Sequence, residues 1–184
     1  MNIKYLLTGI VLVLVFVGFF IYQQASFTGN AVVRNQNQGG NIKIGLEDGN
    51  LAPDFSVTDI EGKLLTQDRL KGKPAMLFFT TTWCTPCQVG ASNLARYDDE
   101  TGGDKFNVAI LFVDPNEDLS KLRQWKLEFG KTDWFIAYAD GMAQTYQVQY
   151  LDTKYVLDKN GIIRWKNLQL LPYETAKQVM GALI

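Results

Sequence analysis

The only two cysteines of this 184-residue chain stand three positions apart, in the segment Trp-Cys-Thr-Pro-Cys at residues 83–87. The segment closely follows an apolar run over residues 75–79, which predicts a buried strand. If a helix begins near Thr85, Cys84 lies at its N-terminus. Unpaired backbone N–H groups and the helix dipole stabilise a thiolate at that place. The pattern therefore predicts a strand, a turn and a helix that carry a dithiol able to open and close as one redox unit.

The spacing also assigns different roles to the two sulfur atoms. Cys87 would lie one helical turn further in, close enough to Cys84 to close a short disulfide. We expect Cys84 to be the nucleophile and Cys87 to be the resolving cysteine. Pro86 suits the first helical turn, where a missing N–H costs little. Trp83 is expected to flank the reactive sulfur as an apolar shield and docking surface.

Other uses of the cysteine pair fit the sequence less well. A structural disulfide that closes so short a loop would constrain the unfolded chain little. A structural zinc site normally needs four ligands, and this chain has no second cysteine pair and no histidine. We therefore expect a redox-active disulfide between Cys84 and Cys87, with no metal and no separate cofactor.

The N-terminal segment predicts a membrane anchor. Residues 5–22 carry no charge, and at about 1.5 Å per residue they reach about 27 Å, close to the thickness of the hydrocarbon layer. A cleaved signal peptide is the alternative, but its apolar stretch is usually shorter. Lys4 precedes the span, and the first basic residue after it is Arg34. This asymmetry favours a single-pass protein whose remaining chain is extracytoplasmic.

Three regions follow from composition. Residues 1–22 are the predicted transmembrane anchor. Residues 23–50 lose periodicity and become polar and low in complexity, which indicates a flexible linker. Residues 51–184 are enough for one folded core. A net charge of −1 gives no support for nucleic-acid binding.

Within residues 51–184, strand and helix patterns alternate. Two short strands around a Glu-Gly turn predict a hairpin at 54–58 and 63–66, and further strands are predicted at 75–81, 108–113, 135–138, 154–157 and 162–165. Apolar stripes predict helices after Cys84, over 119–129 and over 173–183. The predicted class is α/β, with a mixed sheet flanked by helices.

Four segments resemble membrane-anchored thioredoxin-like proteins of the TlpA/ResA type, in the redoxin superfamily. They are Leu-Ala-Pro-Asp-Phe at 51–55, Gly-Lys-Pro at 72–74, the cysteine segment at 83–87 and Tyr-Val-Leu-Asp-Lys-Asn-Gly at 155–161. The resemblance covers about residues 51–184. It implies a thioredoxin fold with an added N-terminal β-hairpin and thiol-disulfide oxidoreductase activity outside the cytoplasm. In that family Cys84 corresponds to the exposed nucleophile and Cys87 to the buried resolving cysteine.

The chain departs from this family at the loop that faces the dithiol. The family normally has a cis-proline there, and the aligned stretch 148–155 places Asp152 at that position. Because a cis bond before a non-proline residue costs about 3–4 kcal/mol, we expect a trans loop of different shape. A carboxylate beside Cys84 would disfavour its thiolate or take up a proton during exchange. Asp152 is therefore a candidate acid/base group, and a solvated turn aspartate is the alternative.

A second departure concerns proton handling beneath the site. Thioredoxin has a buried acid six residues before its first cysteine, where this chain has Phe78. Family members often have a glutamate three residues after the second cysteine, where this chain has Gly90. Lys73, Glu61 and Asp114 are candidates to substitute for these missing groups.

The resemblance favours an enzyme that reduces disulfides of client proteins and is itself reduced by a membrane or extracytoplasmic electron donor. Because the family docks an extended client backbone on the loop facing the dithiol, client contact is expected from Trp83, Pro86, Leu151 and Thr153.

Three other functions stay open at this stage. A Cu(I)-handling or assembly protein could use the same soft thiolates. A non-catalytic binding module could keep the fold without turnover. A peroxidase of the peroxiredoxin type requires Pro-x-x-x-Thr-x-x-Cys; Thr81 fits this pattern, but Leu77 stands where the proline should be.

Overall fold

A computed structural model describes residues 42–184 of the chain. The predicted transmembrane anchor over residues 1–22 lies outside this range, and so does most of the predicted linker. No helix between residues 42 and 184 is long and apolar enough to cross a membrane.

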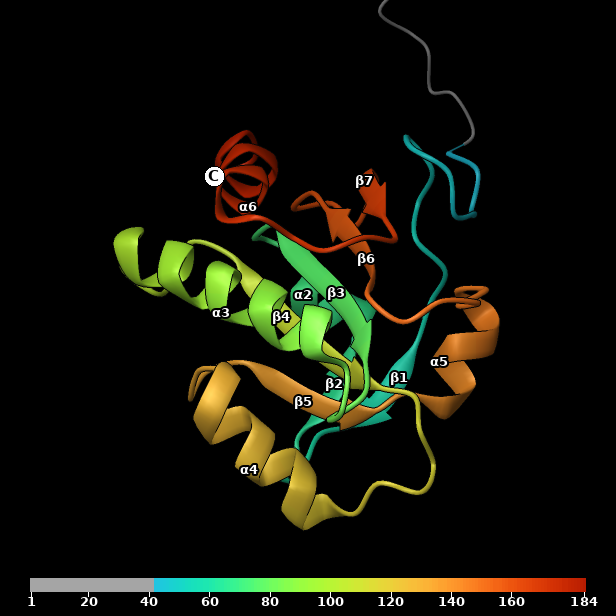
Figure 1. The fold of residues 1–184 in the computed structure, drawn as a ribbon. Coiled ribbons are helices and arrows are strands. Elements are labelled where there is room, and N and C mark those ends of the chain that lie inside the picture. The colour runs from blue at the N-terminus through green and yellow to red at the C-terminus, as the bar shows by residue number, and fades with distance from the viewer. Residues whose placement is uncertain (1–41) are drawn as a thin grey trace, which may run out of the picture. The chain divides into compact units, whose positions relative to one another are not determined.

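A five-stranded mixed sheet organises the described residues (Figure 1). Its strand order is β5-β4-β3-β6-β7. The strands are β3 (Ala75–Thr80), β4 (Asn107–Phe112), β5 (Phe135–Tyr138), β6 (Thr153–Leu157) and β7 (Ile163–Asn167). Strands β3, β4 and β5 run parallel, whereas β6 pairs antiparallel with both β3 and β7. All six residues of β3 are buried, as expected for a central strand covered on both faces.

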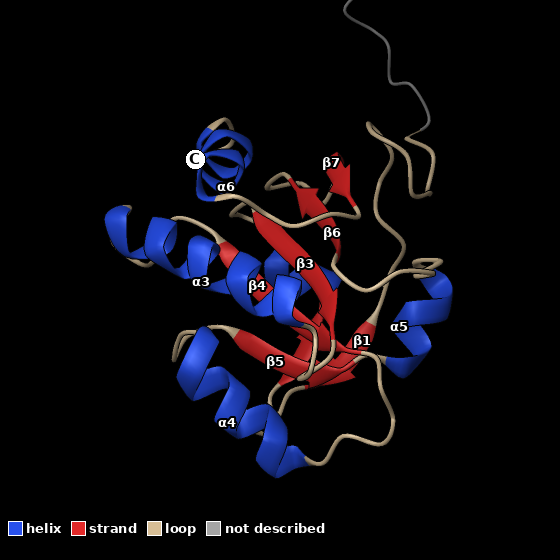
Figure 2. Ribbon diagram, in the orientation of Figure 1, coloured by secondary structure: helices blue, strands red, loops and turns tan. Residues whose placement is uncertain are grey.

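Helices cover both faces of this sheet (Figure 2). The cysteine segment leads into α3 (Thr85–Glu100), which shares one apolar core with α4 (Leu119–Phe129) and α6 (Tyr173–Gly181). The second core lies on the other face. It is covered by α2 (Gln67–Leu70), α5 (Asp140–Thr145) and a hairpin of β1 (Ser56–Thr58) and β2 (Leu64–Thr66).

The alternation of β3 divides its side chains between the two cores. Met76 and Phe78 contribute to the core that contains the cysteines, whereas Leu77 and Phe79 contribute to the other. This separation follows from the two-residue period of a strand. Residue 78, where thioredoxin has its buried acid, therefore faces the dithiol side of the sheet.

The structure confirms the predicted mixed α/β architecture and the added hairpin. Each predicted strand is present, with ends that differ by at most two residues. Two helices, α2 and α5, were not predicted from the sequence; they have four and six residues. Helices this short offer too few turns for an apolar stripe to be recognised.

The chain just before the domain is attached to it by backbone hydrogen bonds. Gly45 N–H donates to the Leu51 carbonyl at 3.0 Å, and Gly49 N–H donates to the Ile163 carbonyl at 2.9 Å. Ile163 N–H in turn donates to the Asn50 carbonyl at 2.9 Å. The described end of the predicted linker thus lies along β7.

A buried carboxylate links the end of α3 to Trp134, the residue before β5. Asp98 is 1% exposed, and one of its oxygens accepts a hydrogen bond from the Trp134 indole at 2.9 Å. The other oxygen has no partner among the described residues. Burial raises the pKa of Asp98, and the Trp134 hydrogen bond only partly opposes this shift.

Asp98→Asn should therefore change how stability depends on pH. Because the folded protein binds this proton more tightly than the unfolded chain, the carboxyl group favours folding at low pH, and this contribution is lost as pH rises through the folded pKa. We expect the stability of Asp98→Asn relative to the wild type to improve by on the order of 1 kcal/mol between pH 4 and pH 7. Urea unfolding at several pH values measures this difference. The exposed neighbour Asp99→Asn is the control, and an equally flat difference for both variants would refute the prediction.

Candidate functional site

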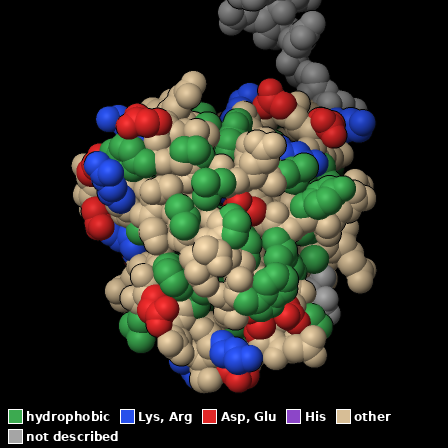
Figure 3. All heavy atoms as spheres, viewed as in Figure 1, with side chains coloured by type: hydrophobic (Ala, Val, Ile, Leu, Met, Phe, Trp, Pro, Cys, Tyr) green, Lys and Arg blue, Asp and Glu red, His purple; other side chains and the backbone are tan. Residues whose placement is uncertain are grey.

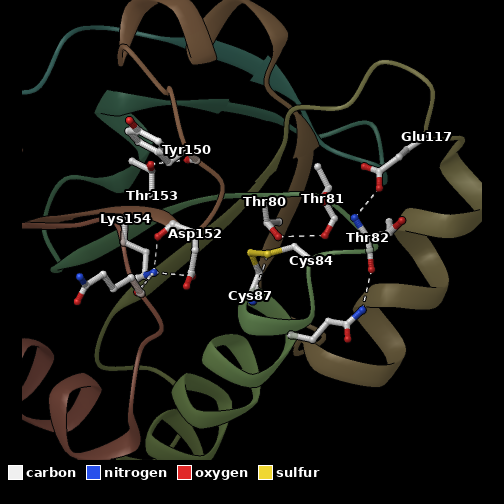
Figure 4. The surroundings of a disulfide bond; sticks show 12 residues. Thr80, Thr81, Thr82, Cys84, Cys87, Glu117, Tyr150, Asp152, Thr153 and Lys154 are labelled. Carbon is white, nitrogen blue, oxygen red and sulfur yellow. Dashed lines mark hydrogen bonds and ion pairs between the residues drawn. A yellow bond between two sulfur atoms is a disulfide. The ribbon is translucent and has the colours of Figure 1, made fainter.

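Cys84 and Cys87 are joined by a disulfide at the N-terminus of α3 (Figure 4). Their Cα atoms are 5.3 Å apart, within the usual range for a disulfide. Cys84 is the N-cap residue, and its sulfur accepts a hydrogen bond from Cys87 N–H at 3.4 Å. Cys84 is 6% exposed, whereas Cys87 is fully enclosed. The Cys84 sulfur is therefore the one that a reactant from solvent meets first.

Hydrogen bonds to both backbone polar groups of Thr82 hold the loop between β3 and α3 in place. Thr82 N–H donates to the carboxylate of Glu117, which comes from the loop between β4 and α4. The Thr82 carbonyl accepts from the Gln88 side chain at 2.7 Å. Glu117 is buried, and its second oxygen has no partner within the described part of the chain. These contacts position the residues that lead into Cys84.

Trp83 stands beside the disulfide with 63% of its surface exposed. Its indole N–H donates to the Asp114 carboxylate at 3.2 Å. Hydrogen bonds from Asn116 N–H and from Trp83 lower the pKa of Asp114. Asp114 thus holds the tryptophan ring in place and stays ionised while doing so.

The other two candidates for proton handling have different partners. The Lys73 ammonium donates to the Asp104 carbonyl at 2.6 Å, at the end of β3 away from Cys84. Glu61 forms ion pairs with Lys63 and Lys126, each at 2.8 Å. Neither Lys73 nor Glu61 contacts the cysteine segment through these hydrogen bonds.

Asp152 lies in the loop before β6, beside the end of β3. Its N–H donates to the Phe79 carbonyl at 3.2 Å. No peptide bond in residues 42–184 is cis, so the expected trans loop is confirmed. Asp152 has a φ of 67°, in the left-handed region that non-glycine residues rarely adopt. The backbone at the family's proline position therefore has a different shape.

The side chain of Asp152 is not a solvated turn aspartate, so that alternative is wrong. Asp152 is 5% exposed and forms an ion pair with Lys154 at 2.6 Å. Its second carboxylate oxygen is enclosed and has no hydrogen-bond partner among residues 42–184. A buried charge requires a partner of opposite sign, and Lys154 provides it.

Lys154 was missed by the sequence analysis. It is fully buried in β6, and its ammonium lies 4.6 Å from the centre of the Phe78 ring. The ammonium also donates to the Gln169 carbonyl at 2.8 Å. Burial lowers the pKa of Lys154, and the hydrogen bond to Asp152 opposes that shift. The only available signal was a single lysine inside an otherwise apolar strand.

Apolar packing occupies the places of the family's missing acids. Phe78 is fully buried beneath the dithiol. A Cβ atom on Gly90 would lie 3.3 Å from the Leu171 side chain and 3.5 Å from the Phe78 ring. Helix α3 therefore packs directly against the segment before α6, with no room for a glutamate directed inward at position 90.

The residues expected to contact a client differ in exposure. Trp83 and Pro86 are exposed and Leu151 is half-buried. Thr153 does not meet the expectation, because its side chain is buried and its hydroxyl donates to the Tyr150 carbonyl at 2.7 Å. Tyr150, which the sequence analysis overlooked, is 63% exposed.

Apolar side chains gather on the face of the molecule over the N-terminal end of α3, with most charged side chains toward the edge of that view (Figure 3). Besides Trp83 and Tyr150, Val89 of α3 and two residues of the segment between β7 and α6, Leu168 and Leu170, are exposed. This surface suits an uncharged, apolar stretch of another polypeptide.

The structure of β3 does not fit the sequence motif of a peroxidase of the peroxiredoxin type. Leu77, at the position of its proline, pairs with Ala109 of β4 and Tyr155 of β6 in the middle of the sheet. A proline cannot donate to such a ladder. The local structure of β3 thus differs from what the peroxidase motif requires.

Taken together, the fold and the site define a thioredoxin-like domain with a disulfide at the N-terminus of a helix. The profile of the AhpC/TSA family matches residues 49–166. The chain therefore belongs to the AhpC/TSA family.

Individual relatives agree with this assignment. The thiol-disulfide oxidoreductase ResA of Bacillus thuringiensis (strain Al Hakam) is 30% identical over 147 residues, covering 77% of this chain and 78% of that protein. The thioredoxin-like protein YneN of Bacillus subtilis (strain 168) is 27% identical over 122 residues, covering 66% and 72%. A thiol:disulfide interchange protein of the thioredoxin family from Chlorobium tepidum TLS superposes with a TM-score of 0.63 at 19% identity, covering 72% of this chain and 94% of its own. The structural match confirms the predicted thioredoxin-like fold.

The different burial of the two sulfur atoms predicts selective alkylation. After reduction, a limiting amount of iodoacetamide should modify Cys84 at least tenfold faster than Cys87, because the thiolate is the reactive form and the helix N-terminus favours it at Cys84. Peptide mass spectrometry of the singly modified protein measures the ratio. Complete labelling in urea provides the control for intrinsic reactivity, and equal labelling of both cysteines in the folded protein would contradict the prediction.

Proposed function

We propose that this protein is an extracytoplasmic thiol-disulfide oxidoreductase that reduces disulfides of client proteins through Cys84 and Cys87. The observation that carries the proposal is the disulfide between an N-cap cysteine and an enclosed cysteine of α3, on a thioredoxin-like fold. The similarity to ResA, a thiol-disulfide oxidoreductase, supports the same activity.

The proposed reaction moves two electrons from the dithiol to the client. The Cys84 thiolate attacks one sulfur of the client disulfide, a mixed disulfide forms, and the second client sulfur leaves as a thiolate that takes a proton from water. Cys87 then loses its proton and attacks the Cys84 sulfur. The first client sulfur leaves as a thiolate, and the Cys84–Cys87 disulfide of this structure remains.

Asp152 is the proposed acceptor of the Cys87 proton. Its enclosed carboxylate has one oxygen bound to Lys154 and one oxygen without a partner in the described residues. A carboxylate with a free oxygen can act as a general base when it lies within reach of the acidic group. This role takes the place of the acids that Phe78 and Gly90 replace.

The client is proposed to dock as an extended, apolar segment. Trp83, Pro86 and Tyr150 are exposed around the disulfide, and Leu151 is partly accessible. Exposed aromatic rings provide large contact areas with little loss of side-chain entropy. The backbone of the loop that contains Leu151 supplies the remaining contacts in this proposal.

The cellular setting is also part of the proposal. Residues 5–22 would anchor the protein in the cell membrane, and residues 23–50 would link the anchor to the domain. In this setting the oxidised protein would be reduced by a membrane or extracytoplasmic electron donor. An extracytoplasmic compartment permits disulfide exchange as working chemistry.

The Cu(I) alternative is less well supported. Asp152, the side chain that the loop would offer as a third ligand, is already bound to the Lys154 ammonium. A carboxylate is also a hard ligand, whereas Cu(I) prefers soft ones. The site therefore favours disulfide exchange over copper binding.

Single cysteine variants test the proposed order of attack. Cys84→Ser should abolish exchange, because Cys87 is enclosed and no other cysteine exists. Cys87→Ser should attack clients and stay attached to them, because the resolving thiol is missing. Non-reducing electrophoresis of cells that express each variant, followed by mass spectrometry of the adducts, measures trapping. Adducts with Cys84→Ser but none with Cys87→Ser would reverse the assigned roles.

The reduction potential tests the direction of exchange. A client reductase should equilibrate near the thioredoxin value of roughly −270 mV, whereas a disulfide donor should lie near −120 mV. The protein is equilibrated with defined thiol buffers, and free thiols are counted by mass after alkylation. A value near −120 mV would refute the proposed direction while leaving the dithiol chemistry intact.

A further inference from the structure

Lys154 lies on the same face of the sheet as the dithiol. It is paired with Phe78 in the antiparallel ladder between β3 and β6, and paired residues project to the same side of a sheet. The Lys154 ammonium lies over the Phe78 ring. Phe78 belongs to the core that also contains Cys84 and Cys87. A buried positive charge thus occupies the region beneath the disulfide.

The Lys154 ammonium is fully satisfied. An ammonium has three donors, and Lys154 directs them to the Asp152 carboxylate, the Asp152 carbonyl and the Gln169 carbonyl. Gln169 belongs to the segment between β7 and α6, whereas Asp152 precedes β6. The ammonium therefore ties together two segments that border the dithiol.

The same contacts hold Asp152 in its unusual conformation. A φ of 67° is rarely adopted by residues other than glycine, asparagine and aspartate. Lys154 binds the carbonyl and the carboxylate of Asp152 on one side of the N–Cα bond, and the Asp152 N–H donates to the Phe79 carbonyl on the other side. In the family this loop is shaped by a proline ring, and here it is shaped by an ion pair.

The ion pair leaves one functional atom free. The second carboxylate oxygen of Asp152 is enclosed and has no partner within residues 42–184. Figure 4 shows Asp152 drawn between Lys154 and the Cys84–Cys87 disulfide. The bound oxygen and the free oxygen of one carboxylate thus have different surroundings, with the ammonium at one and no donor at the other.

We propose that Lys154 is a positioning residue for exchange, which holds the Asp152 carboxylate in place by one oxygen and leaves the other oxygen free to accept the proton of Cys87. The inference rests on the proposed function. When the Cys87 sulfur attacks the mixed disulfide at Cys84, its S–H bond breaks and the proton moves to Asp152. The new S–S bond forms as the bond from Cys84 to the client breaks, and the client sulfur leaves with the electron pair of that bond.

Other titratable groups lie near the dithiol, and the test must separate their effect on the exchange rates from that of Asp152 and Lys154. Glu117 and Asp114 reach the cysteine segment from the loop after β4, through Thr82 and Trp83. The Tyr150 hydroxyl belongs to the same loop as Asp152. On α3, Cys84 and Cys87 themselves titrate once they are reduced. Each of these groups is unchanged in the variants below.

The test uses the reduced full-length chain in detergent, mixed rapidly with one equivalent of 4,4′-dithiodipyridine, so that no second reagent molecule is left to react with Cys87. Attack by Cys84 releases one thiopyridone, and resolution by Cys87 releases a second, so absorbance separates the two steps. We expect Lys154→Met and Asp152→Asn each to slow the second phase at least tenfold at pH 7. The first phase should change less than threefold. Above pH 9 the second phases should converge with the wild type, because hydroxide then removes the Cys87 proton.

Lys166→Met is the matched control. It removes the same charge from the neighbouring strand, where Lys166 is paired with Tyr155 and lies against that ring rather than beneath the dithiol. Its second phase should equal that of the wild type. If Lys154→Met fails to fold, as judged by circular dichroism, the double variant Asp152→Asn, Lys154→Met removes both buried charges and should show the same slow second phase.

Three outcomes would overturn the inference. The first is an unchanged second phase in folded Lys154→Met or in the double variant. The second is slowing of both phases to the same extent without recovery at high pH, which indicates structural damage alone. The third is slowing in Asp152→Asn but not in Lys154→Met, which shows that Asp152 works without Lys154. Failure of the proposed function is distinguishable from all three, because the wild type would then release no second thiopyridone.

Discussion

The pairing of β6 with β3 is the interaction on which the site depends. Strand β3 leads directly into the cysteine segment, and the ladder with β6 places Asp152 beside the end of β3. Cys84 then lies at the start of α3 because the chain turns immediately after this strand. Since β3 is buried on both faces, neither the dithiol nor the loop opposite it can move far without disturbing a core. The rigid sheet therefore sets the distance between groups that are 65 or more residues apart in sequence.

The buried ion pair between Lys154 and Asp152 shapes this loop at a large cost in desolvation free energy. Removing two charges from water costs several kcal/mol per ion, and their attraction repays this only with good geometry and further hydrogen bonds. Lys154 meets that condition, because all three of its donors are used. Asp152 meets it only in part, because one oxygen has no partner among the described residues. A buried polar atom that is left unsatisfied usually reflects a functional requirement or an unseen partner. The asymmetry within the pair is the observation that supports the proposed role of Asp152 as a proton acceptor.

The fold could be predicted from sequence because its determinants are local. Apolar runs bounded by turn residues predicted each strand of the sheet, and the cysteine segment predicted the start of α3. The trans peptide bond at Asp152 was predicted because a cis bond before any residue other than proline is unfavourable in free energy. The short helices α2 and α5 were not predicted because four or six residues contain no recognisable apolar period.

The parts of the site that could not be predicted from the sequence depend on contacts between distant segments. Glu117 binds Thr82 across 35 positions, in a loop where neighbouring acids look equivalent in sequence. Lys154 is a lysine in an apolar strand, and its partners come from loops on either side. Thr153 was expected to meet a client, but all five residues of β6 are buried, and the Thr153 hydroxyl donates to the Tyr150 carbonyl. A short apolar pattern does not show whether other elements cover both faces of a strand.

The two departures from the family are physically linked. Loss of the acid at Phe78 leaves an aromatic face beneath the dithiol, and an aromatic face attracts a cation such as the Lys154 ammonium. That cation in turn permits a carboxylate at the family's proline position, where an unpaired carboxylate would be too costly to bury. Restoring an acid at residue 78 would bring a second negative charge next to Asp152, and a proline at residue 152 would leave Lys154 without its counterion. The Lys154 ammonium thus contacts both departures at once, and in the proposed mechanism the proton-accepting acid comes from the loop that faces the dithiol instead of from β3.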